Sequence, residues 1–496
     1  MDDLELKDVV KEEAIFGRPR SASVSSTNSD DSQAAANGAT DPLLKHADST
    51  RACLPLPPKR WYFRPLRHFR YIILSTYRRL FSVVFVINVV LLGLQLGRRG
   101  RNHRWSAPLL TDVSNTAAAN VMIAVLIRQD YIINTIFRIA WRMPFAAPLA
   151  IRRTLANVYE YGGIHSGAGI SAVLWFSLLS GLLGKEMWGL RIRDYRIKIC
   201  TFSLLPILWI MAITAFPTVR RRMHNMFEHV HRWFGWFSLA LFWWELYLLS
   251  NQIAHQTGPM SPGANLKTLP ATWYLAVATV HIVLPWLRLR RLQVQPEYLS
   301  SHATRLHISE RVKNCVVYRI SESPLGEYHA FACISEKNGV GGSLIISNAG
   351  DWTRKAIDSP RKYYWTRGVP TVGVLCMAQI FRKVVIVTTG SGIGPCLGTI
   401  MGIQGRTSCR ILWSASGPRR TFGDEICDDV TSVDSKAIII DTKVEGRPDL
   451  VRLAYELYVD SGAEAVFCVS NRNLTRKVIY AMESRGIPAY GPIWDS

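Results

Sequence analysis

The stretch GSGIGPC, residues 390–396, directly follows the apolar run KVVIVTT, residues 383–389. Glycines at the end of a buried strand let the chain turn sharply and let a phosphate approach the backbone, and a proline suits the first turn of a helix. The N–H groups and the dipole of that helix favour an anion. We therefore predict a turn that binds a nucleotide phosphate, with a purely structural turn as the alternative. Its residues are Gly390, Ser391, Gly392, Gly394 and Pro395.

The residues around this turn predict two domains. From residue 383 onward, the apolar strands KVVIVTT, CRILWSA, KAIIIDT and EAVFCVS alternate with helices, two of them over LVRLAYELYV and NLTRKVIYAMESRG. This alternation is typical of a doubly wound parallel sheet with helices on both faces. Before it, short alternating runs such as NCVVYRI, EYHAFACI and GSLIISN are separated by Gly, Pro and Ser, which favours a small antiparallel β-barrel. We expect the barrel over residues 301–380 and the α/β domain over 381–496.

The first half of the chain is apolar in long blocks. Of the 496 residues, 48% are hydrophobic, and residues 80–97 (LFSVVFVINVVLLGLQLG) carry no charge. This length is close to the roughly 20 residues that cross a bilayer as a helix. We expect a multi-pass helical membrane domain over residues 59–300, whose second span is provisional because Arg128 and Asp130 interrupt it. The further expected spans are residues 114–141, 161–184, 199–219, 233–254 and 268–287.

Basic clusters predict the orientation of these six spans. They lie at residues 59–79, 152–153, 220–222 and 288–291, all on one side if six spans are present. That side should be the cytosol, although the loops at 98–104 and 185–198 are also basic. Both termini are then cytosolic, and the plasma membrane is the favoured location. The net charge of +22 indicates attraction to the anionic lipid of the bilayer. Nucleic acid is not expected as a partner, because no basic stripe with interleaved aromatics occurs outside the membrane half.

The first 58 residues have a different composition. They are rich in Ser, Ala and Asn, with too little apolar surface to fold alone, and no apolar stretch typical of a cleavable signal follows Met1. Ser21 and Ser23 follow Arg18 and Arg20, so either a phosphorylated or an unmodified tail is open. The nine cysteines have no regular spacing, and free thiols are expected.

Several separated stretches together resemble the ferredoxin-reductase-like part of the ferric reductase and NADPH oxidase superfamily. The stretch EYHAFACIS (327–335) resembles its flavin signature, NAGDWT (348–353) the segment after that signature, and GSGIGPC its nicotinamide-nucleotide turn. EGRPDL and FCVSN resemble two later segments in the same order. More narrowly, IRRTLANVYEYGGIHSGAG, FEHVHRWFGW and RGIPAYGPIWDS resemble the fungal membrane flavoproteins of the TmpA type, which are linked to conidiation. The resemblance covers residues 60–496.

The resemblance implies a membrane-anchored, NADPH-dependent flavoprotein oxidoreductase that passes hydride to FAD on the cytosolic side, with an unknown electron acceptor. FAD would lie against the barrel beside His329, Phe331 and Ser335. Hydride transfer between stacked rings requires geometry and exclusion of water, so no acid–base pair is expected. Ala330 and Ala332 replace the Pro and Thr of the flavin signature. A hydroxyl that would reach the flavin is therefore missing.

Four further residues receive a role through the resemblance. Cys468 would lie near the nicotinamide, and Trp494 would cover the flavin. Arg419 and Arg420 follow the strand CRILWSA, where they could pair with a 2′-phosphate and select NADPH over NADH. The alternatives are a buried strand cysteine, a packed C-terminus and ordinary surface arginines.

The membrane half departs from the superfamily at its haem sites. Transmembrane members hold two haems between two helices that each bear two histidines about four turns apart. His165 and His231 occupy the first position on each helix, but the second positions hold Leu178 or Leu179 and Trp244 or Glu245. Two interpretations of His165 and His231 are open. They could hold one haem b, or they could be structural histidines that form hydrogen bonds. Glu245 and His281 are expected to form hydrogen bonds to each other or to the backbone.

Two rival functions remain at this stage. One is a transmembrane ferric reductase or NADPH oxidase-like electron carrier, which the absent second histidines oppose. The other is a catalytically inactive nucleotide-binding sensor or scaffold, for which Ala332 is the best support.

Overall fold

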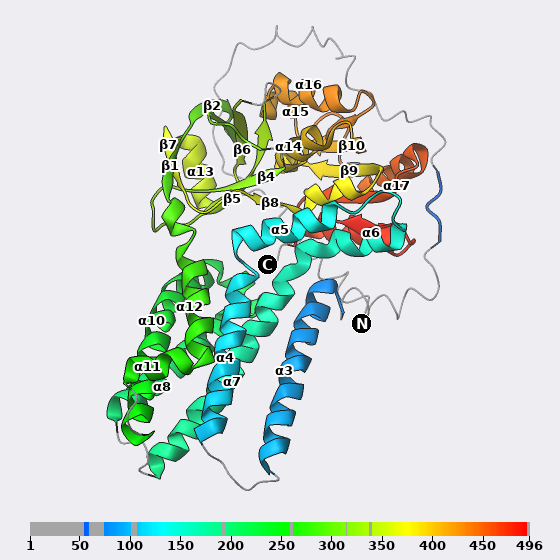
Figure 1. The fold of residues 1–496 in the computed structure, drawn as a ribbon. Helices are drawn as coiled ribbons and strands as arrows, with labels where there is room; N and C mark the ends of the chain where they lie inside the picture. The colour runs from blue at the N-terminus through cyan, green and yellow to red at the C-terminus, as the bar shows by residue number, and fades with distance from the viewer. Residues whose placement is uncertain are drawn as a thin grey trace, which may run out of the picture. The chain divides into compact units, whose positions relative to one another are not determined.

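The computed structural model describes a helical region followed by two sheets (Figure 1). The described residues are 54–58, 74–100, 107–189, 194–257, 261–313, 315–336 and 340–493. The architecture confirms the expected fold class, in which membrane-type helices precede an antiparallel half-barrel and a parallel α/β sheet.

The main helices of the first half are α3 (Thr76–Gly100), α4 (Ala107–Leu126), α7 (Gly162–Trp188), α8 (Tyr195–Ala215), α10 (His224–Thr257) and α12 (Pro270–Val283). In the described chain, five helical segments are long and apolar enough to cross a membrane. They are Thr76–Gly97, Leu109–Leu126, Leu149–Trp188, Tyr195–Ala215 and Pro270–Arg288. Helix α10 covers the fifth expected span and is not among these five. Shorter helices are α6 (Leu149–Leu155), η2 (Ala156–Tyr161), α9 (Pro217–Arg222), α11 (Pro262–Thr268) and η3 (Trp286–Arg288).

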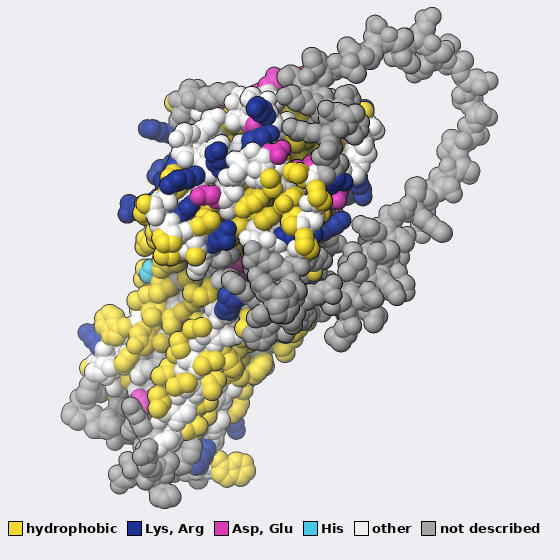
Figure 2. Space-filling view, turned by 90° about the vertical axis from the view of Figure 1, so that its right-hand side faces the viewer, with side chains coloured by type: hydrophobic (Ala, Val, Ile, Leu, Met, Phe, Trp, Pro, Cys, Tyr) yellow, Lys and Arg dark blue, Asp and Glu magenta, His cyan; other side chains and the backbone are white. Residues whose placement is uncertain are grey.

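The surface of the helices fits a lipid environment. Val83, Val86 and Val89 on α3 are each more than half exposed, which would be costly in water over so many residues. On the face shown in Figure 2, hydrophobic side chains cover the helical segments, whereas Lys and Arg side chains gather over the two-sheet part and at helix ends.

The second span is shorter than expected, which corrects its predicted end at Trp141. Helix α4 ends at Leu126, and α5 (Asp130–Trp141) packs instead against β8 and the turn η4 of the C-terminal half. The side chain of Gln129 caps α5 by accepting hydrogen bonds from the backbone N–H groups of Tyr131 and Ile132. The physical reason is Asp130, which is buried and forms an ion pair with Arg319 in the half-barrel.

The half-barrel is an eight-stranded antiparallel sheet with the order β1-β7-β4-β5-β6-β3-β2, in which β8 pairs with β4. Helix α13 (Asp351–Asp358) packs against β6. The first strand of the half-barrel begins at Arg290, before the predicted domain boundary at residue 301. The strands are β1 (Arg290–Gln293), β2 (Gln295–Ser300), β3 (Ala303–Ile308), β4 (Val316–Ser321), β5 (His329–Ser335), β6 (Gly342–Ser347), β7 (Tyr363–Thr366) and β8 (Thr371–Val372).

The second sheet has five parallel strands in the order β11-β10-β9-β12-β13. From the central strand β9 the chain builds outward through β10 and β11, and then returns to the other side of β9 with β12. The direction of winding therefore reverses between β9 and β12, and ligands of such sheets bind outside the carboxyl ends of the strands at this reversal. The strands are β9 (Lys383–Thr389), β10 (Ser408–Ala415), β11 (Ile438–Asp441), β12 (Ala465–Val469) and β13 (Ala489–Tyr490).

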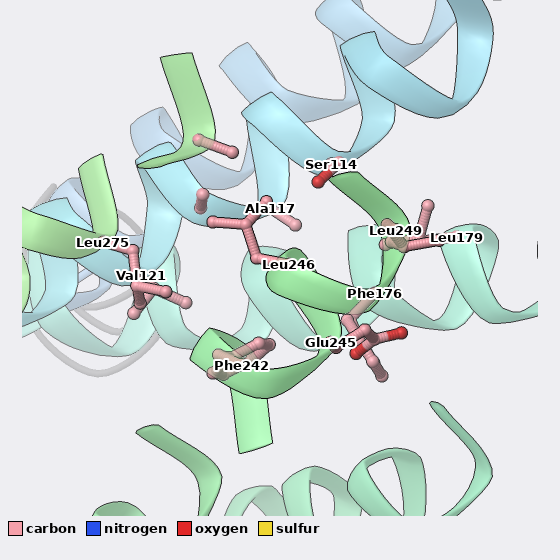
Figure 3. A pocket seen from close by; sticks show the side chains of 12 residues that line it. Ser114, Ala117, Val121, Phe176, Leu179, Phe242, Glu245, Leu246, Leu249 and Leu275 are labelled. Carbon is pink, nitrogen blue, oxygen red and sulfur yellow. The ribbon is translucent and has the colours of Figure 1, made fainter. Parts of the chain in front are cut away.

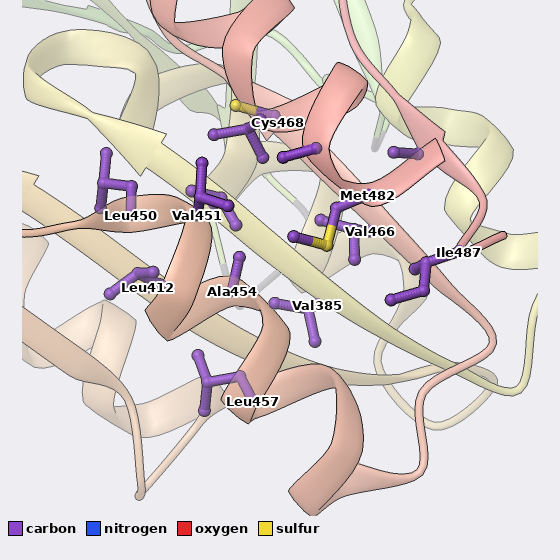
Figure 4. Close-up of a cluster of buried hydrophobic side chains, with 14 of the residues drawn as sticks. Val385, Leu412, Leu450, Val451, Ala454, Leu457, Val466, Cys468, Met482 and Ile487 are labelled. Carbon is purple, nitrogen blue, oxygen red and sulfur yellow. The ribbon is translucent and has the colours of Figure 1, made fainter. Parts of the chain in front are cut away.

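Helices and turns connect these strands. The turn η4 (Val374–Ile380) precedes β9, and η5 (Gly390–Gly392) and α14 (Ile393–Ile403) follow it. The remaining helices are α15 (Pro418–Phe422), α16 (Asp424–Val433), α17 (Leu450–Ser461) and α18 (Arg472–Glu483). Apolar residues of the sheet and of α17 and α18 form one buried core (Figure 4).

Candidate functional site

The GSG turn lies at the reversal point of the parallel sheet, directly after β9. Gly390 has a φ of +51°, a left-handed conformation that favours glycine. Its carbonyl accepts a hydrogen bond of 3.0 Å from Nε1 of the buried Trp413. A Cβ at Gly392 would lie 2.5 Å from Oγ1 of Thr388 and 2.6 Å from the carbonyl oxygen of Val469. Gly390 therefore serves the turn itself, whereas Gly392 lets the turn pass close to the end of β12.

Hydroxyl groups surround the turn at the carboxyl ends of β9 and β12. The side chain of Thr388 donates to the carbonyl of Val469 at 2.9 Å, and the hydroxyls of Thr389 and Ser470 bond to each other. Ser391, in the turn itself, is half-buried. This combination of backbone N–H groups and hydroxyls at a helix N-terminus is suited to a phosphate.

Helix α14 connects the turn to the half-barrel. A Cβ at Gly398 would lie 2.2 Å from the carbonyl oxygen of Cys333 in β5, and one at Gly394 would lie 3.4 Å from Cβ of Ile345 in β6. The helix therefore packs on the backbone of the predicted flavin strand. Gly394, predicted as a phosphate residue, has a packing role here. Gly398 was missed, although its spacing of four residues from Gly394 was a usable signal.

The predicted flavin residues lie around an aromatic side chain that the sequence pattern did not single out. The ring of Trp352, in the first turn of α13, lies 4.3 Å from the ring of His329 and 5.8 Å from that of Phe331, between centroids. His329 and Phe331 pair across the ladder with Ile320 and Tyr318 of β4, which belong to the barrel core. These two predicted residues therefore share the inward face of β5.

Two polar atoms of the half-barrel are buried without a hydrogen-bond partner among the described residues, namely Nε2 of His329, which lies beside Trp352, and Oγ of Ser347, at the end of β6. The nearest carboxylate oxygen to His329 is that of Glu327 at 3.6 Å, which is beyond hydrogen-bond distance. Burial lowers the pKa of the His329 imidazole, so the ring is neutral at pH 7. Ser335, at the other end of β5, is also buried. Unpaired buried polar atoms fit a site that a cofactor completes.

The two predicted phosphate-binding arginines differ in their surroundings. Both lie on α15, directly after β10. Nη1 of Arg419 lies 2.7 Å from Oδ1 of Asp424 and 3.5 Å from Oδ1 of Asp428. Arg420 is exposed. Arg420 is therefore the better placed of the two to meet an external phosphate.

Cys468 lies in the core and Trp494 lies outside the described residues. The Cys468 side chain is fully buried among Val466, Met482 and other residues between the sheet and α17 and α18 (Figure 4). Burial raises the pKa of its thiol to about 12. At neutral pH the thiol is protonated and faces an apolar core.

The two predicted haem histidines lie on α7 and α10. Nδ1 of His165 is 2.8 Å from the carbonyl oxygen of Ala124, which fixes the orientation of the ring. Nδ1 of His231 is buried and has no hydrogen-bond partner, and its ring lies 4.5 Å from that of Phe227. In the described residues, no group of three or more His, Cys, Asp or Glu side chains could hold a metal ion. A haem that uses only these two histidines stays a prediction.

Glu245 lines a small cavity within the helices (Figure 3). The cavity has a volume of about 40 Å³ and lies between α4, α7, α10 and α12. Oε1 of Glu245 accepts a hydrogen bond of 2.6 Å from Oγ1 of Thr201, and Oε2 is buried without a partner. His281 instead bonds through Nδ1 to the backbone carbonyl of Val277 at 2.8 Å. The backbone bond expected for His281 is present, whereas Glu245 uses a threonine of α8.

Polar contacts join the helical region to the two sheets, and the sequence pattern did not predict them. The guanidinium of Arg152, at the end of α6, donates to both carboxylate oxygens of Glu464 at 2.8 and 2.9 Å and to the carbonyl of Ile380. The amide of Asn134 in α5 bonds to the backbones of Pro370 and Val372. These partners are more than 200 residues apart in sequence, so no local signal could reveal them.

Comparisons with known proteins found similarity to two fungal reductases. A family model described as the C-terminal domain of adenylate-forming reductase 03009 matches residues 374–496. The chain is 42% identical over 441 residues to adenylate-forming reductase 03009 of Coprinopsis cinerea, and 41% identical over 442 residues to adenylate-forming reductase 06235 of the same fungus. Each alignment covers 88% of this chain and 42% of the relative. The chain thus spans less than half the length of the curated relatives that it matches.

Solved structures give weaker likenesses. A ferredoxin NADP+ reductase from Neisseria gonorrhoeae with bound FAD and NADP has a TM-score of 0.35 at 13% identity, and covers 41% of this chain and 98% of its own. A ferredoxin-NADP+ reductase from Plasmodium falciparum with 2′P-AMP has a TM-score of 0.31 at 10% identity, and covers 40% of this chain and 95% of its own.

Proposed function

We propose that this chain is a membrane-anchored NAD(P)H-dependent flavin oxidoreductase that passes hydride from NADPH to FAD at the junction of its two sheets. The observation that carries the proposal is the packing of α14. This helix starts at the GSG turn and touches the backbone of β5 at Gly398, so one rigid element joins the nucleotide turn to the predicted flavin strand.

In this proposal the nucleotide lies at the carboxyl ends of β9 and β12. The N–H groups that follow Gly390, together with the hydroxyl of Ser391, bind its pyrophosphate. Arg420 binds the 2′-phosphate that distinguishes NADPH from NADH, whereas Arg419 is already engaged by Asp424 and Asp428. Cys468 keeps a role beside the nicotinamide only if its thiol leaves the core, and Trp494 keeps its predicted role as the flavin cover.

The half-barrel supplies the flavin site. When bound, FAD supplies the ring that accepts a hydride. The neutral His329 offers it a hydrogen bond from Nε2, an atom that is buried and unpaired in the described protein alone. Phe331 and Trp352 provide aromatic surface and exclude water. Ser335, the last residue of β5, lies at the far end of this site. Because Ala332 has no hydroxyl, ring binding depends on these contacts rather than on a side-chain bond at that position.

The relatives support the reductase part of the proposal. Their printed name joins adenylate formation with reduction, and the matching family model is their C-terminal domain. We propose that the aligned part carries the reduction, since a parallel sheet with a dinucleotide-type turn occupies residues 383–490. A role in conidiation, a plasma-membrane location and cytosolic termini follow only from the TmpA-type resemblance and the basic clusters, and are part of the same proposal.

Two other functions each have one observation in their favour. The unpaired Nδ1 of His231 favours an electron carrier with a single haem b between α7 and α10. The alanine at position 332 favours an inactive nucleotide-binding sensor or scaffold.

The visible spectrum of the full chain purified in detergent tests these functions against one another. The proposed function predicts flavin bands that bleach when NADPH is added without oxygen. An additional Soret band would support the haem carrier. A colourless, monodisperse preparation that takes up no flavin would contradict the proposal and leave the inactive scaffold.

A further inference from the structure

Helices α3 and α7 touch backbone to backbone at one end. On α7, Gly163, Gly167 and Ser171 follow one another at intervals of four residues and so share one face. A Cβ at Gly163 would lie 2.1 Å from the carbonyl oxygen of Tyr77, and one at Gly167 would lie 2.9 Å from that of Phe81. Small residues at such intervals allow the closest approach of membrane helices.

One turn further along, the two helices enclose a pocket of about 180 Å³. Its walls are apolar except for Asn88 and Ser171, and none of the described residues that line it is charged. Val89, Leu96 and Leu174 line the pocket and are more than a third exposed. The pocket is therefore open on the apolar outer surface of the helices. Ser171 lies nine residues after Gly162, the first residue of α7. The pocket is therefore about 14 Å from that end of the helix, measured along its axis.

The wall beside the pocket is held by a saturated hydrogen-bond network. The amide nitrogen of Asn88 donates to the carbonyl of Val84 and to Oδ1 of Asn120. Oδ1 of Asn88 accepts from Nδ2 of Asn120 at 2.7 Å and from Nε1 of Trp175 at 2.8 Å. Asn88 therefore has no remaining capacity for a ligand, and the wall is rigid.

Ser171 is different. The residue is 1% exposed, and its buried hydroxyl has no hydrogen-bond partner among the described residues. Two other serines on α7 donate to the carbonyl four residues back. Ser177 bonds to Val173 and Ser180 to Phe176, each at 2.8 Å. A buried hydroxyl without a partner is unfavourable, because burial removes the hydrogen bonds that water would otherwise make to it. The fourth serine of α7, Ser166, bonds to the hydroxyl of Tyr77. Ser171 is therefore the one serine of this helix without a partner among the described residues, and it is the one that lines the pocket.

We propose that this pocket binds an uncharged, lipid-soluble molecule with a ring and a hydroxyl or carbonyl oxygen, whose oxygen bonds to Ser171. Membrane sterols and isoprenoid quinones share this chemistry. An apolar cavity of about 150 Å³ takes a benzene ring, so the pocket accommodates one ring while the rest of the molecule extends into the bilayer. The absence of charge among the lining residues excludes a phospholipid headgroup. This inference is independent of the redox chemistry proposed above.

Photolabelling of the full chain in lipid nanodiscs tests the proposal. The probes are a diazirine-bearing sterol, a diazirine-bearing ubiquinone analogue and a straight-chain diazirine fatty acid without a ring, and labelled peptides are located by mass spectrometry. A ring-bearing probe should label α3 or α7 at the pocket, and unlabelled sterol or quinone should compete with its own probe. The probe that labels identifies the source.

Three variants make the test specific. Ser171→Ala should reduce pocket labelling about threefold to tenfold, the usual range for one hydrogen bond. Leu174→Trp, which fills the mouth from its exposed rim, should abolish it. Ser180→Ala is the matched control, since this serine is equally buried in the same helix but bonds to the backbone. All variants are compared at equal monodispersity. The proposal is overturned by equal labelling with the fatty acid, by labelling unchanged in Leu174→Trp, or by no labelling with either ring.

Discussion

At the residue scale, the glycines of the stretch GSGIG (residues 390–394) have three separate roles that the sequence motif does not distinguish. Gly390 adopts a left-handed conformation, Gly392 passes close to Val469, and Gly394 packs on Ile345. The motif predicts a turn because a strand and a helix flank it. It does not reveal the partners, because Val469 and Ile345 belong to other parts of the chain. A substitution such as Gly392→Val would therefore disturb the sheet and would not report on nucleotide binding alone.

Coenzyme selection is a prediction at the same scale. Arg420→Ala should raise the KM for NADPH about tenfold, because one charge-assisted hydrogen bond to a phosphate is lost. The KM for NADH, which has no 2′-phosphate, should be unchanged. The comparison uses steady-state reduction of an artificial dye with either coenzyme. Arg419→Ala is the matched control, because its guanidinium is held by Asp424 and Asp428. An equal effect of both substitutions on NADPH would remove Arg420 from the phosphate site.

At the scale of elements, the sequence pattern located strands and helices of the α/β domain well. The strands expected at KVVIVTT and EAVFCVS are β9 and β12, and the two expected late helices are α17 and α18. These elements are buried on the sheet side, so apolar runs mark them. Helix α5 was predicted as part of a span because it is apolar. Its true neighbours are set by Asp130 and Arg319, a contact across 189 residues that hydropathy cannot report.

The contact between α6 and the parallel sheet gives a prediction about an element. Arg152 is buried, and it bonds to Glu464 and to the carbonyl of Ile380. Arg152→Ala should destabilise this junction by on the order of 2–3 kcal/mol, because the carbonyl of Ile380 loses the guanidinium donor and the carboxylate of Glu464 keeps only the backbone N–H of Arg382. Limited proteolysis near residues 286–290 should become faster, with the circular dichroism of both sheets unchanged. Cleavage at the wild-type rate would contradict the assigned role.

The same ion pair predicts a pH dependence. The hydrogen bond from Arg152 lowers the pKa of the Glu464 carboxyl below its ordinary value of 4.5. The stabilisation is therefore complete above pH 4.5 and is lost as the pH falls from there through the lowered pKa. The proteolysis rates of the wild type and Glu464→Gln should differ at pH 7 and converge in acid. Rates that differ equally at both pH values would show that the ionised carboxylate is not responsible.

At the scale of the whole molecule, contacts between distant segments constrain the topology. Leu56 packs against the core of the α/β domain, and the carbonyl of Pro57 accepts a hydrogen bond of 2.9 Å from Nε of Arg485. A segment before the first candidate span therefore contacts a domain after the last one. Five segments qualify as spans by length and hydropathy. Because this contact requires an even number of crossings in a chain that spans a bilayer, we propose that α10 supplies a sixth.

Site-directed labelling tests this count. A cysteine introduced at Arg222, before α10, and one introduced at Gly263, after it, should lie on opposite faces of the membrane. An impermeant maleimide applied to intact spheroplasts should label Gly263→Cys and should reach Arg222→Cys only after permeabilisation. The unmodified chain serves as the control for its native cysteines. Labelling of both positions from the same side would show that α10 does not cross.

We propose that NADPH bound at the GSG turn reduces a flavin held by the half-barrel, and anaerobic stopped-flow absorbance measures this step. Ser391→Asp places a negative charge in the turn, and Ser391→Asn is its uncharged match of similar size. NADPH should bleach the flavin in the wild type and in Ser391→Asn. Ser391→Asp should retain its flavin and bleach at least about a hundredfold more slowly, as expected for a phosphate facing a carboxylate. Bleaching of Ser391→Asp at the wild-type rate would contradict the claim.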